Sequence, residues 1–209
     1  MAIRRHDDQP ARGADMGTTW RRALPVLKGA CVALRELQLR DAAALLTHLS
    51  GPNVARYIVP PPSTLEDMRR FIRWARRVRR EGRHVIFGVV PAGQSEPVGV
   101  MQVWKVENDF SVAECGFVLS EAYSGQGLFT ESATLMFDFA FHTLGVHRLE
   151  ARVAVGNEQG HAVLRKLGAI REARLRDSFK RGDAYEDHIL WCLVANDWIG
   201  LASSDRQTH

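Results

Sequence analysis

The sequence has no apolar run long enough to span a membrane. Across its 209 residues, no apolar stretch approaches the roughly 20 that a transmembrane helix needs. The first residues also lack the hydrophobic region of a signal peptide. The apolar fraction is nevertheless 45%, enough for one domain with a substantial core. We therefore expect a cytoplasmic protein with no membrane partner.

Cysteine is scarce. The three cysteines, Cys31, Cys115 and Cys192, are widely separated and lie in strand-like patterns. The chain has no C-x-x-C pair, and its histidines do not show metal-binding spacing. These absences argue against a disulfide framework and against a zinc site. We expect small core residues in a reducing compartment, and no metal.

Lysine is also rare, since only Lys28, Lys105, Lys166 and Lys180 are lysines among 28 basic residues. The net charge is +4 and the pI is near 9.2. A basic surface favours nucleic acid or a ribosome-associated target, but this charge is small for the length of the chain. We therefore do not expect nucleic acid as a partner. The arginine skew is typical of genome composition.

The two ends of the chain differ from its middle. Residues 1–25 are polar, rich in arginine and without periodicity, which predicts a flexible tail in which Trp20 docks locally. Residues 200–209 form a second polar tail. One domain is expected between them, over residues 26–199.

The most informative stretch runs from Val112 to Leu144. Alternation predicts a strand over 112–119 with Glu114, Gly116 and Val118 on one face. A turn at 124–127 then opens a helix that Gly145 ends. The apolar residues of this helix recur at three- and four-residue spacing: Phe129, Ala133, Met136, Phe137, Ala140 and Leu144.

The turn Ser124-Gly125-Gln126-Gly127 is a candidate anion site. A glycine turn that opens a helix presents unpaired N–H groups at the positive end of the helix dipole, which attracts phosphate. No lysine of the G-K-[ST] type follows, which argues against a nucleoside-triphosphate loop. An ordinary strand-to-helix turn is the alternative. The turn alone does not decide between the two.

Periodicity predicts the remaining elements. Strands are expected at 31–37, 85–90, 98–104, 148–155, 170–175 and 185–194, and helices at 41–49, 63–81 and from Asn157 to Gly168. Ser63 and Glu66 fit a capping box. The arginines of the second helix are either a solvated face or an acidic-partner patch. The strand, helix and strand from 112 to 155 predict a parallel pair within an otherwise antiparallel sheet.

The runs AECGFVLSEAYSGQGLFTESATLMFDFAF and HRLEARVAVGNEQGHAVLRKLGAIREARLR resemble the GNAT acetyltransferases. The resemblance is to the RimJ/RimL-like branch, which acetylates ribosomal-protein N-termini. It implies an α/β (α+β) fold with a mixed, mostly antiparallel central sheet, helices on both faces and a splay at the acetyl-CoA site. The chain departs from the family pattern at Ala122, usually Arg or Gln, at Gly160, usually Ser, and at Ala169, usually aromatic.

The resemblance also implies where acetyl-CoA binds. Backbone N–H groups of the turn would contact the diphosphate, and an N–H at Val118 or Leu119 would bind the thioester carbonyl. The expected coenzyme-binding residues are Phe117, Val118, Leu119, Ser124, Gly125, Gln126, Gly127, Leu128, Phe129, Thr130 and Asn157.

Glu114 is the candidate catalytic residue. Acetyl transfer needs a neutral amine, and a carboxylate beside the turn would remove the proton directly or through one water. A surface salt bridge is the alternative. Cys115 faces the opposite side, which argues against an acetyl-cysteine intermediate. His161 would replace the missing Ser at Gly160 as a donor to the leaving thiolate, or is simply exposed.

These observations predict an acetyl-CoA-dependent N-acetyltransferase that acts by direct transfer in a ternary complex. The expected acceptor is a protein N-terminal amine, such as that of a ribosomal protein, and the resemblance implies that residues near Tyr57 and the run Pro60-Pro61-Pro62 shape substrate choice. The alternatives are acetylation of a small amine (an amino acid, polyamine or aminoglycoside), or a non-catalytic protein that binds acyl-CoA or nucleic acid. The sequence leaves the oligomeric state open, with a homodimer as one option.

Overall fold

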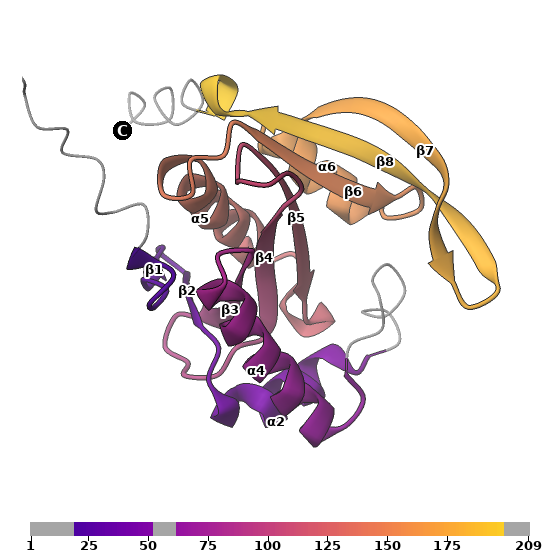
Figure 1. Ribbon diagram of the computed structural model, residues 1–209. Helices are drawn as coiled ribbons and strands as arrows, with labels where there is room; N and C mark the ends of the chain where they lie inside the picture. Colours follow the sequence, from indigo (N-terminus) through magenta and orange to yellow (C-terminus); the bar gives the residue numbers. More distant parts are fainter. Residues whose placement is uncertain (1–18, 52–61, 199–209) are drawn as a thin grey trace, which may run out of the picture.

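The computed structural model describes residues 19–51 and 62–198. Its centre is one eight-stranded sheet with the order β1-β2-β3-β4-β5-β6-β8-β7 (Figure 1). Neighbouring strands are antiparallel except for β5 and β6, which are parallel. The strands are β1 Leu27–Lys28, β2 Val32–Glu36, β3 His84–Pro91, β4 Gly99–Lys105, β5 Val112–Leu119, β6 Arg148–Ala154, β7 Ile170–Arg181 and β8 Ala184–Val194. The predicted mixed, mostly antiparallel sheet is confirmed.

Helices connect and cover these strands. They are α2 Ala42–Leu49, α4 Leu65–Arg80, α5 Leu128–His142 and α6 Glu158–Lys166, with short 3-10 turns η1 Leu39–Asp41 and η2 Glu121–Tyr123. The N-cap of α4 is Thr64, whose hydroxyl accepts a hydrogen bond from the Asp67 N–H at 3.1 Å. The predicted cap at Ser63 is therefore wrong by one residue, because Thr64 and Asp67 satisfy the same spacing. None of the described helices is long and apolar enough to cross a membrane.

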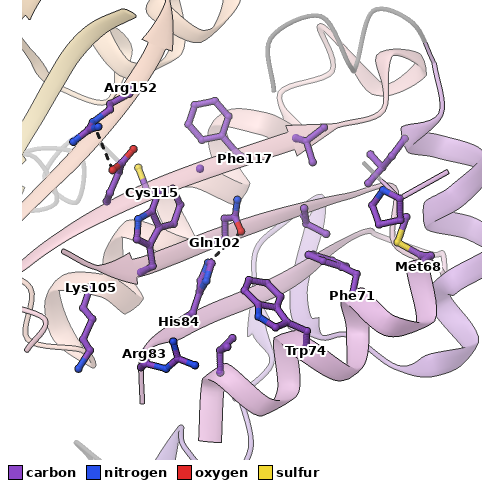
Figure 2. Close-up of a pocket in the computed structure, with 18 of the residues that line it drawn as sticks. Met68, Phe71, Trp74, Arg83, His84, Gln102, Lys105, Cys115, Phe117 and Arg152 are labelled. Carbon is purple, nitrogen blue, oxygen red and sulfur yellow. Dashed lines mark hydrogen bonds and ion pairs between the residues drawn. The ribbon is translucent and has the colours of Figure 1, made fainter. Parts of the chain in front are cut away.

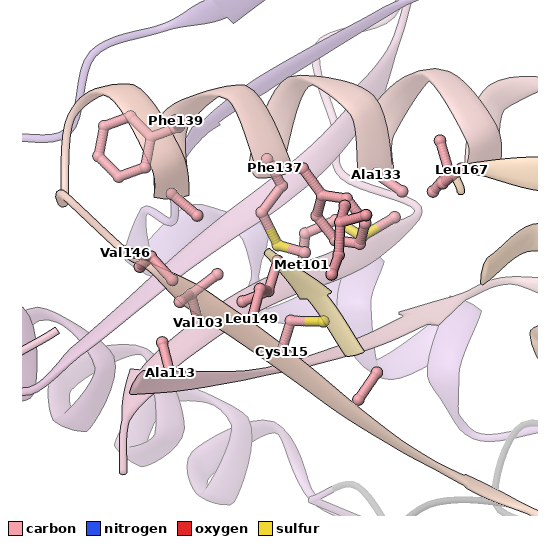
Figure 3. Packing of buried hydrophobic residues seen from close by; sticks show 14 of the residues in the cluster. Met101, Val103, Ala113, Cys115, Ala133, Phe137, Phe139, Val146, Leu149 and Leu167 are labelled. Atoms are coloured by element: carbon pink, nitrogen blue, oxygen red, sulfur yellow. The ribbon is translucent and has the colours of Figure 1, made fainter. Parts of the chain in front are cut away.

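The two faces of the sheet carry separate groups of buried side chains. The larger group, here called the α5-face core, includes Met101, Phe137 and Leu149 (Figure 3). It continues to Leu164 on α6. The smaller group, the α4-face core, joins α2 and α4 to the other face. Its members are Leu37, Ala42, Leu45, Leu49, Met68, Ile72, Ala75, Ile86 and Val100. Helices thus cover both faces, as predicted.

Residues from the predicted N-terminal tail take part in the fold. Trp20 is only 3% exposed and meets Phe110 edge to face at 5.7 Å. The Arg79 guanidinium donates to the carbonyl of Trp20 at 3.1 Å and to Glu36 at 2.7 Å. Leu24 is also buried. The local docking expected for Trp20 is therefore present. Residues 1–18 lie outside the described part of the chain.

The parallel pair β5 and β6 separates partway along its length. The two strands pair from Val112 with Arg148 to Cys115 with Ala151. Beyond that point β5 continues to Leu119, still paired with β4, while β6 continues to Ala154, still paired with β8. The sheet therefore opens between the two strands after Cys115. This opening positions the site described next.

Candidate functional site

A groove of about 750 Å³ lies between α4 and strands β3 to β5 (Figure 2). Phe71 and Trp74 of α4 border it on one side, and Trp104 of β4 contributes to the sheet side. The groove extends to Glu114 on β5 and Arg152 on β6, the two strands that separate. It therefore joins the α4 face of the sheet to the opening between β5 and β6.

The Glu114 side chain lines this groove and is 15% exposed. Its Oε2 lies 3.6 Å from Nε of Arg152. Burial raises the pKa of Glu114 above its ordinary value, with Arg152 opposing and Glu150 adding to the shift. The two interpretations of Glu114 are therefore compatible, since the carboxylate has an ion-pair partner and still lines a cavity. A raised pKa brings a carboxylate closer to the range in which general bases operate.

Cys115, the next residue, points to the opposite face. Its side chain is buried in the α5-face core, and burial raises the pKa of its thiol. A thiol becomes a nucleophile only as the thiolate, which this environment disfavours. The prediction that Cys115 is a core residue is confirmed, and the structure gives no support to an acetyl-cysteine step.

The end of β5 leads to the start of α5. Past Cys115, the edge of β5 that faces β6 has no ladder partner among the described strands. The ring of Phe117 meets that of Phe129 in the first turn of α5 at 4.5 Å and nearly perpendicular. Phe117 and Val118 also line the groove, which none of residues 119–130 does. Of the predicted coenzyme residues, Phe117 and Val118 thus line the groove, Leu119 ends β5, residues 124–130 form the loop and first turn of α5, and Asn157 precedes α6.

The loop before α5 has room for a ligand. Gly125 and Gly127 have φ angles of 75° and 78°, and a Cβ at either position would meet nothing within 4 Å. Gly127 is the N-cap of α5 and provides no side-chain cap. The Gln126 amide donates to the carbonyl of Ala122 at 3.1 Å, so Gln126 itself ties the loop together. Open space beside an uncapped helix start fits the diphosphate of a coenzyme.

Asn157 has a local structural role. Its Oδ1 accepts a hydrogen bond from the Gly160 N–H at 3.0 Å and caps α6. A Cβ at Gly160 would lie 3.0 Å from a Val153 methyl carbon and 3.1 Å from the Asn157 amide nitrogen. A serine there would require its neighbours to move, which gives a local reason for glycine at this departure from the family pattern.

His161 is not exposed, so that expectation is wrong. It is 7% exposed, its Nδ1 accepts from the indole N–H of Trp191 at 3.0 Å, and its Nε2 lies 3.3 Å from the Val155 carbonyl. These contacts fit a neutral ring with its hydrogen on Nε2. Both nitrogens are occupied, so His161 does not replace a donor to the thiolate. Its position three residues before buried Leu164 was the available sequence signal.

The aromatic lining of the groove was not predicted from the sequence. Rings follow one another from Phe71 to Trp74 at 5.8 Å, from Trp74 to His84 at 5.3 Å and from His84 to Trp104 at 5.4 Å. His84, Trp104 and Glu114 are also register partners across β3, β4 and β5. Because paired residues share a face, the correct hairpin registers would have placed them together. Tyr57 lies outside the described residues, while Pro62 lines the groove.

His84 is held neutral within this lining. Its Nε2 lies 3.1 Å from the Gln102 side-chain oxygen, and Figure 2 shows the two side chains meeting in the groove. Burial lowers the pKa of His84 to about 4. The ring therefore contributes no positive charge near neutral pH.

The matching family model is the acetyltransferase (GNAT) domain, over residues 32–170. More than half of the chain matches, and it belongs to this family. The chain is an N-acetyltransferase, and the fold and the chemistry expected from the resemblance are both confirmed at this level.

Several N-acetyltransferases are similar in sequence to this chain. The chain is 25% identical to the uncharacterized N-acetyltransferase p20 of Bacillus licheniformis, over 81% of this chain and 96% of that one. Two Escherichia coli enzymes match over shorter parts. Spermidine N(1)-acetyltransferase is 27% identical over 54% of this chain and 61% of its own length. [Ribosomal protein uS5]-alanine N-acetyltransferase is 25% identical over 57% and 62%.

One relative has been solved with the coenzyme bound. The RimJ protein of Mycobacterium smegmatis, in complex with CoA-disulfide, is 25% identical over 82% of this chain and 85% of its own, with a TM-score of 0.73. The family and this coenzyme-bound relative support acetyl-CoA as the cosubstrate. The relatives include a ribosomal-protein enzyme and a polyamine enzyme, so they do not decide the acceptor.

Proposed function

We propose that this protein transfers an acetyl group from acetyl-CoA to the N-terminal amine of a polypeptide, in a ternary complex without an acyl-enzyme. The observation that carries the proposal is the separation of β5 from β6 after Cys115 and Ala151. Among the described strands, the edge of β5 that faces β6 is left unpaired from Gly116 onward, next to Glu114 and leading toward the glycine loop. A donor and an acceptor would therefore meet at a carboxylate.

Two parts of the chain would hold acetyl-CoA. The N–H groups of Gln126, Gly127, Leu128 and Phe129 would bind its diphosphate, because they surround an uncapped helix start. Leu128 would contribute its backbone N–H and not its side chain, because the side chain is buried. The free edge at Phe117, Val118 and Leu119 would bind the arm that carries the acetyl group. We propose Ser124, Gly125, Thr130 and Asn157 as further contacts from the family resemblance.

Glu114 would act on the amine. In the proposed reaction the amine nitrogen attacks the thioester carbonyl carbon, the C–N bond forms, and the C–S bond breaks as coenzyme A leaves. Glu114 accepts the proton from the amine, directly or through a water. A protein α-amine has a pKa of about 7.7–8.0, against about 10.4 for lysine, so a carboxylate base has less to overcome there.

A small amine is the second candidate acceptor. The spermidine enzyme is as similar to this chain as the uS5-alanine enzyme is. The N-terminal acceptor is favoured by the groove, whose described lining includes several aromatic rings and two carboxylates, Glu107 and Glu114. A polyamine acetyltransferase would need anionic groups for the distant ammonium groups of its substrate.

Coenzyme binding tests the loop assignment. Titration calorimetry with acetyl-CoA is expected to show binding, and Gly127→Ala is expected to weaken it at least tenfold by placing a methyl group in the open space. Gly93→Ala is the matched control, because Gly93 has the same φ of 78° and the same empty surroundings, in the β3–β4 connection. The two substitutions have equal backbone cost. Equal coenzyme affinity in the two variants would contradict the loop assignment.

Turnover tests the acceptor. A thiol-release assay with acetyl-CoA is expected to detect acetylation of peptides with a free N-terminus, and none of the same peptides with a blocked N-terminus and no lysine. Activity with spermidine and amino acids, but not with any peptide, would replace the first candidate with the second. Binding of acetyl-CoA without turnover of any amine would overturn both.

A further inference from the structure

The acceptor groove has an aromatic character that nothing in the general reaction requires. Phe71, Trp74, His84 and Trp104 form a continuous row of ring contacts between 5.3 and 5.8 Å. Trp74 is 37% exposed, so part of this surface remains uncovered. A row of this kind binds flat or bulky apolar groups by burial and by ring stacking.

Gly116 places Trp104 next to the candidate base. A Cβ on Gly116 would lie 3.2 and 3.3 Å from two Trp104 ring carbons and 3.0 Å from the Gln102 amide nitrogen. The indole therefore lies against the backbone of β5 at a position that only glycine leaves open. Gly116 is two residues from Glu114 and on the same face of the strand. An apolar group resting on Trp104 would bring an attached amine close to the carboxylate.

The charges around the groove do not suit a polycation. Of its described lining residues, the carboxylates are Glu107 and Glu114, and the basic residues are Arg83, Lys105 and Arg152. Arg152 pairs with Glu114 at 3.6 Å, which removes much of the attraction that this carboxylate would exert. His84 is neutral. Arg83 in turn pairs with Glu81, so Glu107 is the one carboxylate among the described lining residues that has no ion-pair partner and is left for a second or third ammonium group.

We infer that the acceptor is a monoamine whose amine-bearing carbon also carries a large apolar or aromatic group, which stacks on Trp104 while the amine reaches Glu114. This inference rests on the proposed function and narrows it to polypeptides with a large apolar first residue. Gly116 and Trp104 are then specificity determinants.

The experiment uses the full chain and acetyl-CoA with three peptides that differ only in their first residue, Phe, Leu or Ala, and with spermidine. The expected kcat/KM for the Phe and Leu peptides exceeds that for the Ala peptide by about tenfold or more, which is the size expected for burying an aromatic or aliphatic side chain against a ring. Spermidine is expected to rank below the Ala peptide.

Variants assign the preference to the ring. Trp104→Ala is expected to lower kcat/KM for the Phe peptide about tenfold and for the Ala peptide less than about threefold, so that the preference nearly disappears. Gly116→Ala is a second, smaller change that displaces the same ring and should reduce the preference in the same direction. Tyr185→Ala is the matched control, because Tyr185 is 57% exposed on β8 and does not line the groove. Acetyl-CoA affinity and melting temperature of each variant report on folding.

The outcomes separate this inference from the proposed function. Equal kcat/KM for the three peptides, or a higher value for spermidine, would overturn the inference and leave N-acetyl transfer in place. An equal loss for all peptides in Trp104→Ala would also overturn it, since the ring would then serve the fold and not the choice of acceptor. No turnover of any acceptor would overturn the proposed function, and the inference with it.

Discussion

The two faces of the central sheet have different roles, and adjacent residues of β5 show the contrast. Cys115 faces α5, where the side chains of strands and helix fill the space between them. Glu114 faces the α4 side, where a groove of about 750 Å³ remains. Strand β5 gives the buried residues Ala113 and Cys115 to the α5-face core, but only the partly buried Val118 to the α4-face core. One face of the same strand stabilises the fold and the other is free for chemistry.

The contrast has a physical cause in side-chain size and pairing. On the α4 side, Gly116 contributes no side chain and the Trp104 ring lies against its backbone, whereas side chains of the strands and of α5 fill the α5-face core. At the same level β6 diverges from β5. The closed side tolerates little change, because interiors are close-packed. Substitutions on the α4 side should therefore change stability little but lower activity.

Glu114→Gln should produce the largest effect. We expect kcat/KM to fall about 10²- to 10⁴-fold, because the amide cannot accept the proton of the amine. Acetyl-CoA affinity and melting temperature should change little, since Glu114 belongs to the open face. The measurement is thiol release at saturating acetyl-CoA, with Glu107→Gln as the matched control at an exposed carboxylate of the same groove. Wild-type turnover by Glu114→Gln across the pH range would remove Glu114 from the reaction.

His84, in the groove on the α4 side of the sheet, should make the protein less stable at acid pH. Its pKa is lowered to about 4 in the folded protein, against an ordinary value near 6.5, so the unfolded chain binds the extra proton between these values. The contribution to stability is complete above about pH 6.5 and is lost as the pH falls toward 4. The total is about 3 kcal/mol, of which about 2 kcal/mol is lost by pH 5.

Urea unfolding at pH 7 and pH 5 checks this prediction for the wild type and His84→Phe. The substitution keeps a ring beside Trp74 and Trp104 and removes the titrating group. The free energy of unfolding of the variant should therefore fall less between the two pH values. Identical decreases would show that His84 does not cause the acid sensitivity.

Much of the framework could be predicted from the sequence. The strand Val112–Leu119 has the predicted bounds, and the helix after the glycine turn begins and ends close to the expected positions. These elements have regular periodicity and glycine boundaries, so local pattern and local structure agree. The opening beside Glu114 followed from the family resemblance, because strand separation leaves no mark in hydrophobic periodicity.

The parts that the sequence did not predict depend on contacts between distant residues. Trp104 and His84 belong to strands that were expected, but their meeting in one groove depends on the hairpin register. His161 was expected to be exposed because a helix start is usually solvated, and Trp191 from β8 overrides this by donating to it. Strand β7 extends past the predicted end near residue 175 to Arg181, with register irregularities and a positive φ at Asp177 that no alternation signals.

Cys115→Ala should affect stability and leave catalysis unchanged. Removal of one buried atom from the closed face should lower the free energy of unfolding by about 1 kcal/mol, comparable to a small core truncation. We expect kcat/KM to stay within about twofold of the wild type, because the proposed transfer is direct and the thiol is buried in the α5-face core. Urea unfolding and thiol release measure the two quantities. Loss of activity with full coenzyme affinity would instead indicate an acetyl-cysteine step.

Substitution of Arg152 should have the smallest effect, and it tests whether Glu114 sets the acid limb of the pH profile. Arg152 opposes the rise in the pKa of Glu114, so Arg152→Gln should raise that pKa further and move the acid limb of the kcat/KM profile to higher pH. The Arg152 side chain is 45% exposed, so solvent screening should keep the displacement below about one pH unit and make it smaller at high salt. Arg152→Lys should restore most of the wild-type profile because it retains the charge. A displacement to lower pH would mean that the acid limb reports a group other than Glu114. A different residue would then be the base.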